Sequence, residues 1–204
     1  MTILDLGRVV GIVRYRTVGD LDAVLAVLVE SGIAVVEITL DTPEALAAIS
    51  RAADAGMMIG AGTVRSMDDV RASAEAGARF VVSPSLIDDV VEGALRLGVE
   101  PIPGVLSPTE LDRAAALGAE SVKVFPAGPV GGPAFISALR GPYPEFGLLP
   151  TGGVEIDEIP AYLDAGATAV GIGGSLAGRR PPANDDEFEA LRVRAVATAQ
   201  AAGR

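Results

Sequence analysis

Eight short apolar runs, rich in β-branched residues, recur along this chain at similar spacing. Each is followed by a longer stretch of Ala, Leu, Asp, Glu and Arg with the periodicity of an amphipathic helix. Nearly continuous apolar runs are typical of strands buried on both faces, as in a parallel sheet. The predicted strands are Val9–Arg14, Ala34–Leu40, Met58–Val64, Phe80–Pro84, Pro101–Leu106, Ser121–Pro126, Leu148–Thr151 and Ala169–Gly173.

The stretches between these strands carry the signals of helix ends. Ser66, Ser107 and Asp157 stand where a side-chain oxygen can cap the free N–H groups at a helix start. Glycines stand where a left-handed residue would end a helix, at Gly32, Gly56, Gly77, Gly98, Gly118 and Gly166. The predicted helices cover residues 20–31, 43–55, 66–76, 87–97, 108–117, 133–140, 156–165 and 185–201.

Eight strand–helix units without a break in composition predict an α/β fold, a (β/α)8 TIM barrel, as a single domain over residues 1–204. A short N-terminal segment would precede the barrel and a C-terminal helix would end it. The alternative is an open doubly wound sheet, but neither terminal strand carries the charges that usually protect a sheet edge. The stretch 178–186 is interpreted as a surface connection. In a barrel, the site would lie at the C-terminal ends of the strands.

Composition restricts the chemistry of that site. The chain has no Cys and no His, and its formal net charge is −11. Disulfides, thiolate nucleophiles, Ser-His-Asp triads and typical zinc sites are therefore excluded, and we expect no metal or cofactor, although a carboxylate site for Mg²⁺ or Ca²⁺ stays open. The acidic charge argues against a nucleic-acid partner, and no apolar run predicts a membrane span. Without a secretory signal pattern, we expect a cytoplasmic protein.

Lys123 is the most informative residue, because it is the only lysine beside fifteen arginines and lies inside a predicted core strand. A guanidinium stays protonated, whereas a desolvated lysine amine can become neutral and attack a carbonyl to form a Schiff base. Glu37 interrupts the second apolar strand and shares one face with Val35 and Thr39. The pair could form a structural salt bridge, or Glu37 could move protons for the amine.

Other polar residues fall at predicted strand ends. Arg14 ends the first strand, where it could bind a substrate carboxylate or form a surface ion pair. Thr63 ends the third strand after two glycines, which let a ligand or strand approach the backbone. Glycine pairs follow the seventh and eighth strands, the usual phosphate-binding place in such barrels, although both could be simple tight turns. These pairs are Gly152-Gly153 and Gly173-Gly174, the latter followed by Ser175.

Taken together, the strand-end motifs resemble the 2-keto-3-deoxy-6-phosphogluconate (KDPG) and 4-hydroxy-2-oxoglutarate aldolase family, class I. The resemblance covers nearly the whole chain. It rests on Glu37-Ile38-Thr39-Leu40, Gly60-Ala61-Gly62-Thr63-Val64, Ser83-Pro84, Pro103-Gly104, Lys123-Val124-Phe125-Pro126-Ala127 and Pro150-Thr151-Gly152-Gly153-Val154.

The resemblance implies a role for each matching residue. Lys123 would be the Schiff-base lysine and Glu37 the general acid and base. The residues implied in substrate binding are Arg14, Thr63, Pro84, Phe125 and Thr151, and those implied in phosphate binding are Gly152, Gly153, Gly173, Gly174 and Ser175. The substrate would be a 2-keto acid such as KDPG, cleaved to pyruvate and glyceraldehyde 3-phosphate, or 4-hydroxy-2-oxoglutarate. A homotrimer is also implied.

Asp41 departs from the family pattern, since many members carry an arginine in that loop. An acidic side chain there cannot bind a carboxylate, so Arg14 would take more of that role. The galactonate epimer, KDPGal, therefore remains an alternative substrate. Two other readings of the site stay open. One is a phosphosugar isomerase or epimerase that uses Lys123 only as a charge, and the other is a non-catalytic metabolite sensor.

Overall fold

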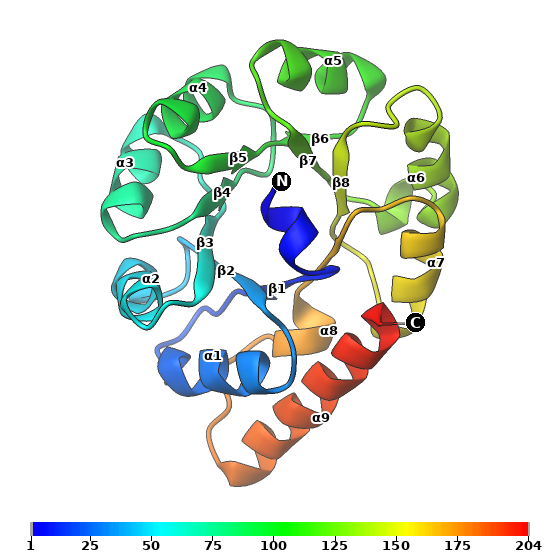
Figure 1. Cartoon of the computed structure of the whole chain (residues 1–204). Coiled ribbons are helices and arrows are strands. Elements are labelled where there is room, and N and C mark those ends of the chain that lie inside the picture. The colour runs from blue at the N-terminus through cyan, green and yellow to red at the C-terminus, as the bar shows by residue number, and fades with distance from the viewer. Residues whose placement is uncertain (1, 204) are drawn as a thin grey trace.

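The computed structural model describes residues 2–203 and has the predicted barrel architecture, with parallel strands surrounded by helices (Figure 1). All strand pairings are parallel, and most strands pair with the next one along the chain. The strands are β1 Val9–Val13, β2 Val35–Thr39, β3 Met58–Gly62, β4 Phe80–Val82, β5 Glu100–Ile102, β6 Gly104–Val105, β7 Ser121–Val124, β8 Gly147–Pro150 and β9 Val170–Ile172.

The prediction of one continuous strand over 101–106 is wrong, because the segment divides at Pro103. β5 pairs with β4, whereas β6 pairs with β7, so the ring consists of a six-stranded and a three-stranded sheet. Proline has no N–H for the ladder, and the Pro103 carbonyl instead accepts the backbone N–H of Lys123 at 2.8 Å. At the other junction, a single bridge joins Thr151 to Gly171.

The helices form a ring outside the strands (Figure 1). Ser66 and Ser107 cap α3 and α5 as predicted, and the six glycines at helix ends all have positive φ. Asp157 is not a cap, because it lies within the 3-10 turn η3, Ile156–Glu158. The helices are α1 Leu21–Glu30, α2 Ala45–Asp54, α3 Met67–Glu75, α4 Asp88–Arg96, α5 Pro108–Ala116, α6 Pro133–Arg140, α7 Ile159–Asp164, α8 Gly174–Ala177 and α9 Asp185–Ala202.

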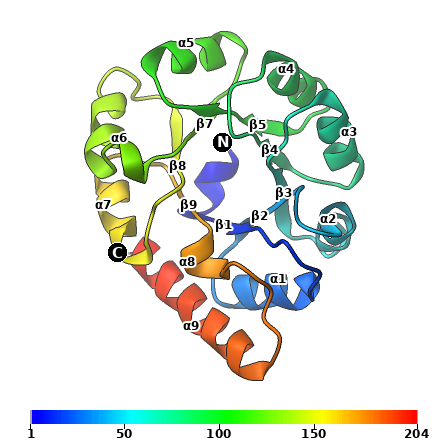
Figure 2. The same cartoon turned by 180° about the vertical axis from the view of Figure 1, so that it is seen from behind.

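Two apolar layers hold the barrel together. The larger lies between the strands and the helices. The smaller fills the barrel interior and includes Val10, Val35, Phe80 and Leu149, together with Ile3 and Leu4. The last two belong to the 3-10 turn η1, Ile3–Leu6, which lies across the N-terminal end of the strands in Figure 1 and behind them in Figure 2. The barrel interior is therefore closed at its base.

None of the helices within residues 2–203 is sufficiently long and apolar to cross a membrane.

Candidate active site

A cavity of about 640 Å³ opens at the C-terminal ends of the strands. Its lining includes every predicted site residue except Glu37, which lies deeper in the barrel. The predicted residues that line it are Arg14, Thr63, Pro84, Lys123, Phe125, Thr151, Gly152, Gly153, Gly173, Gly174 and Ser175. The C-terminal position arises because parallel strands present their last residues at one end of the ring.

Lys123 reaches this cavity from β7. Its residue is only 5% exposed, and its Nζ lies 5.0 Å from the centre of the Phe125 ring. The neighbouring strands place Gly104 and Leu149 beside it in register. Burial lowers the pKa of Lys123, because desolvation disfavours the ammonium; the positive charge of Arg14 acts in the same direction, while Glu37 opposes it. The amine is thus biased toward its neutral, nucleophilic form.

Glu37 lies beneath the cavity, on β2, and is 1% exposed. Neither carboxyl oxygen has a hydrogen-bond partner within residues 2–203. Burial raises the pKa of Glu37, against the opposing charges of Lys123 and Arg14. Space for the carboxyl group comes from Gly62, where a Cβ atom would stand 2.5 Å from Oε1. A side chain at position 62 would therefore collide with the Glu37 carboxyl.

The amine and the carboxyl group affect each other electrostatically without forming an ion pair. Each shifts the pKa of the other, yet no nitrogen–oxygen contact within 4.0 Å joins Lys123 and Glu37 in the described part of the chain. The sequence left a structural salt bridge open as an alternative, and this arrangement does not contain it. Both groups face the barrel interior and are not paired with each other. Both are therefore available to exchange protons with a bound substrate.

Arg14 stands at the end of β1 and is already held on two sides. Its Nη2 donates to the Thr63 hydroxyl at 2.7 Å, and its Nε lies 3.7 Å from Asp41, which also contacts Arg16 at 3.4 Å. Thr63 adopts φ +61°, a conformation that costs energy for a residue with a side chain and that often marks functional sites. An incoming carboxylate would therefore compete with Asp41 for Arg14.

Another part of the cavity wall is made of glycine-rich backbone. Gly152 and Gly153, after β8, both have positive φ, and the Ser175 hydroxyl donates to the Val154 carbonyl at 3.2 Å. Behind this wall, the last carbonyls of α8 accept the Tyr15 hydroxyl at 2.9 Å and the Arg194 Nε at 2.8 Å. These two bonds fix the position of α8 and thereby that of Gly173, which precedes it.

Five further residues line the cavity that the sequence analysis did not select: Ile12, Val154, Glu155, Gly171 and Arg179. Ile12 shares a strand face with Arg14, so period-two alternation could have identified it. Arg179 lies in the connection after α8, and no local pattern distinguishes it from its neighbour Arg180.

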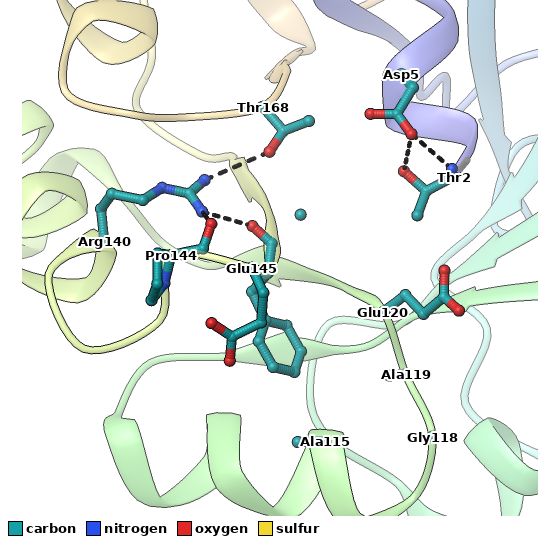
Figure 3. Close-up of a pocket in the computed structure, with 12 residues that line it drawn as sticks. Thr2, Asp5, Ala115, Gly118, Ala119, Glu120, Arg140, Pro144, Glu145 and Thr168 are labelled. Carbon is teal, nitrogen blue, oxygen red and sulfur yellow. Dashed lines mark hydrogen bonds between the residues drawn. The ribbon is translucent and has the colours of Figure 1, made fainter.

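A second cavity, of about 790 Å³, opens at the base of the barrel (Figure 3). Its one basic side chain among the lining residues, Arg140, is committed to the structure. Arg140 donates to the carbonyls of Tyr143, Pro144, Phe146 and Gly166. The remaining charged groups of the lining are the carboxylates of Asp5, Glu120 and Glu145. Within the described residues, this hollow therefore offers no free cation to an acidic substrate.

Known proteins with similar sequences are aldolases of one family. The family model for KDPG and KHG aldolase matches residues 1–191. A 2-dehydro-3-deoxy-phosphogluconate aldolase of Treponema pallidum is 39% identical over 175 residues, 84% of this chain and 82% of that protein. A probable 2-dehydro-3-deoxy-6-phosphogalactonate aldolase of Rhizobium meliloti is 36% identical over 193 residues, 93% of this chain and 88% of that protein.

A solved structure has the same fold. The KDPG aldolase of Legionella pneumophila, which holds pyruvate captured as a covalent carbinolamine intermediate, superposes with a TM-score of 0.81. It is 26% identical, and the alignment covers 96% of each chain. With the family model matched over nearly the whole length and the predicted strand-end residues gathered at one cavity, the chain belongs to the KDPG and KHG aldolase family.

Proposed function

We propose that this chain is a class I aldolase that cleaves a 2-keto-3-deoxy-6-phospho sugar acid. The observation that carries the proposal is the solitary lysine of the chain, buried at the mouth of the barrel above an unpartnered buried carboxyl group. A lysine with a lowered pKa is the side chain suited to capture a ketone, and an acid with a raised pKa is suited to exchange protons near neutral pH.

The reaction begins with a new carbon–nitrogen bond. The neutral Lys123 amine attacks the C2 carbonyl carbon of the substrate, and the proton that its nitrogen then loses passes to the carbonyl oxygen to give a carbinolamine. Glu37 in its acid form then protonates that hydroxyl, which leaves as water, and a protonated imine remains. The carbinolamine in the Legionella pneumophila relative is the corresponding species for pyruvate.

Cleavage uses the imine as an electron sink. The Glu37 carboxylate, directly or through a water molecule, takes the proton of the C4 hydroxyl, and the C3–C4 bonding electrons move to C3 to form an enamine. The aldehyde departs. Glu37 returns its proton to C3, and hydrolysis of the resulting imine releases pyruvate and the free amine. A positioned acid–base group of this kind contributes about 10²- to 10⁴-fold to the rate.

The remaining predicted residues would hold the substrate. Arg14 and Thr63 are proposed to contact its carboxylate end, and Pro84 and Phe125 to line its carbon chain, with Thr151 beside them. Backbone groups of Gly152, Gly153, Gly173 and Gly174, with the Ser175 hydroxyl, are proposed to receive the phosphate. All of these residues line the same cavity, which supports this assignment.

The preferred sugar acid is proposed to be KDPG, with KDPGal as the second candidate and 4-hydroxy-2-oxoglutarate as a smaller substrate. Relatives similar to this chain include enzymes named for both phosphorylated acids. Asp41 beside Arg14 is the feature that keeps KDPGal in consideration. Pyruvate release measured on the three compounds, at matched concentrations, distinguishes them by kcat/KM.

Borohydride trapping tests the covalent step. Incubation with pyruvate and borohydride is expected to add one reduced pyruvate group, and peptide mapping is expected to place it on Lys123. Lys123→Arg separates this mechanism from a phosphosugar isomerase. Arginine keeps the charge but cannot form an imine, so aldol cleavage is expected to disappear, whereas an electrostatic lysine would leave measurable activity. Unmodified wild-type protein after trapping would overturn the proposal.

A homotrimer and a cytoplasmic location are also proposed, on the family resemblance alone. Analytical ultracentrifugation tests the first, and a single species of monomer mass would contradict it.

A further inference from the structure

We infer that Arg179 is a specificity-determining residue, which binds the terminal phosphate of the substrate and gives phosphorylated acids their advantage over unphosphorylated ones. The inference rests on the proposed aldolase function and deepens it. Arg179 is exposed and lines the cavity that contains Lys123. It also lines an adjoining hollow together with Arg14, Arg16, Gly173 and Gly174.

The backbone separates Arg179 from its neighbour Arg180. Between α8 and these arginines stands Gly178, with φ +80° and ψ −177°, a conformation that residues with side chains rarely adopt. After this turn Arg179 lines both the active-site cavity and a hollow beside α9, whereas Arg180 lines only the hollow beside α9. Arg180 forms a forked ion pair with Glu187, at 2.7 and 2.6 Å. Two adjacent arginines thus have different surroundings.

Among the described residues at the rim of the cavity, Arg179 is the one cationic side chain without a partner. Arg14 is held by Thr63 and Asp41, and Arg16 shares Asp41 with it. Arg179 has no hydrogen bond or ion pair in the structure of residues 2–203. Lys123 does not supply the positive charge for the phosphate, because burial lowers its pKa and its proposed role is to form the imine with the substrate ketone.

The chemistry of the phosphate group fits this free guanidinium. A phosphate carries up to two negative charges at neutral pH, and the formal net charge of the chain, −11, repels it at long range. Arginine binds phosphate oxygens through two parallel N–H donors. Gly152, Gly153 and Ser175 lie on the same cavity and offer neutral donors only. One guanidinium beside them therefore supplies the local positive charge of the phosphate seat.

The test compares Arg179→Ala with its matched control Arg180→Ala. For Arg179→Ala we expect kcat/KM on the preferred phosphorylated acid to fall about tenfold, through KM, because the variant loses a charge-assisted hydrogen bond to the phosphate at an exposed rim. Activity on 4-hydroxy-2-oxoglutarate, which has no phosphate, should change less than about twofold. Arg180→Ala should leave both substrates within about twofold, and Arg179→Lys should restore part of the loss.

The outcomes separate this inference from the proposed function. Equal losses on both substrates, or no loss on either, would overturn the role of Arg179 while the aldolase function stands. If the wild-type protein releases no pyruvate from any substrate, the proposed function fails, and calorimetry with inorganic phosphate then decides the inference. Weaker phosphate binding in Arg179→Ala than in Arg180→Ala supports it, and equal binding overturns it.

Discussion

Each half of the barrel contains a glutamate removed from solvent, Glu37 fully buried and Glu100 half-buried, and the two differ in their surroundings. Below the cavity at the mouth, Glu37 has no hydrogen-bond partner among residues 2–203 and lies in the field of Lys123 and Arg14. Near the base, Glu100 accepts the backbone N–H of Ile3 at 2.8 Å and thereby ties η1 to β5. Burial raises the pKa of both carboxyl groups. Burial alone therefore does not single out Glu37; the nearby amine and the open cavity support its proposed role as the catalytic acid.

The cavities at the two ends of the barrel also differ in the charged groups that line them. The two hollows are of comparable size, yet at the base the arginine is bound to carbonyl oxygens and the other charges are acidic (Figure 3). The hollow at the mouth contains a buried amine, glycine-rich walls and Arg179, which has no partner among residues 2–203. The availability of unpaired groups, and not size, distinguishes the two hollows.

Replacing each glutamate by glutamine tests whether the two carboxyl groups have different roles. Glu37→Gln should lower kcat by about 10²- to 10⁴-fold, because the amide keeps the shape but cannot exchange protons. Glu100→Gln, the matched control at the base, should keep kcat within about twofold. Steady-state pyruvate release measures both. Equal losses in the two variants would show that burial, and not position, determines the role of the acid.

Gly62→Ala tests the space that the mouth provides for Glu37. The new Cβ would stand 2.5 Å from Oε1, so the carboxyl group must move. A displacement of about 1 Å can cost about 100-fold, and we expect kcat to fall about 10- to 100-fold. Gly141→Ala is the control, because its Cβ would meet nothing closer than 3.7 Å. Full activity in Gly62→Ala would contradict the packing argument.

The pH dependence of imine formation tests how Glu37 affects the pKa of Lys123. Because the pKa of Lys123 is lowered, the neutral amine should predominate at pH values below the free-lysine pKa of about 10.4, and trapping should slow as the pH falls through the lowered value. Glu37 raises the pKa of Lys123, so Glu37→Gln should move this acid limb to lower pH. The rate of pyruvate trapping with cyanoborohydride measures both profiles. If the acid limb of the profile does not move in Glu37→Gln, the electrostatic interaction between Glu37 and Lys123 is excluded.

The smallest effect concerns stability at the base. The folded state raises the pKa of Glu100, so its stabilising contribution is complete below the unfolded pKa, about 4.3, and is lost as the pH rises through the folded value. Glu100→Gln should therefore melt slightly higher than wild type at neutral pH, by about 2 °C, and the difference should vanish in acid. Thermal unfolding across pH measures this. A lower melting temperature at neutral pH would show that the Ile3 bond needs the charge.

Much of the architecture could be predicted from the sequence, because strand burial and helix ends are local signals. The glycines at helix ends, for example Gly32 and Gly118, have the positive φ that was expected of them. The division at Pro103 was not predicted, since the apolar run continues across it and only the ladder registers reveal the break. The single-turn helix α8 was also missed, because four residues show no periodicity.

The candidate site shows the same limit. Lys123 and Glu37 attract attention because a charge inside an apolar strand is costly, and this signal is local. Arg179 and Gly62 gain their significance from residues far away in the chain, and Arg179 follows a turn whose direction the sequence does not display. Contacts between separate strand ends decide such roles, and one sequence read alone contains no record of them.

The turn η1 has a kinetic consequence. Ile3 and Leu4 close the N-terminal end of the barrel interior. Substrate and products therefore enter and leave the proposed catalytic cavity through the opening at the C-terminal ends of the strands. On the proposed mechanism the aldehyde fragment loses its only covalent link when C3–C4 breaks, while the pyruvyl fragment stays attached to Lys123 beneath it. Departure is therefore sequential, with the aldehyde out first, and in the synthetic direction pyruvate must be loaded before its partner arrives.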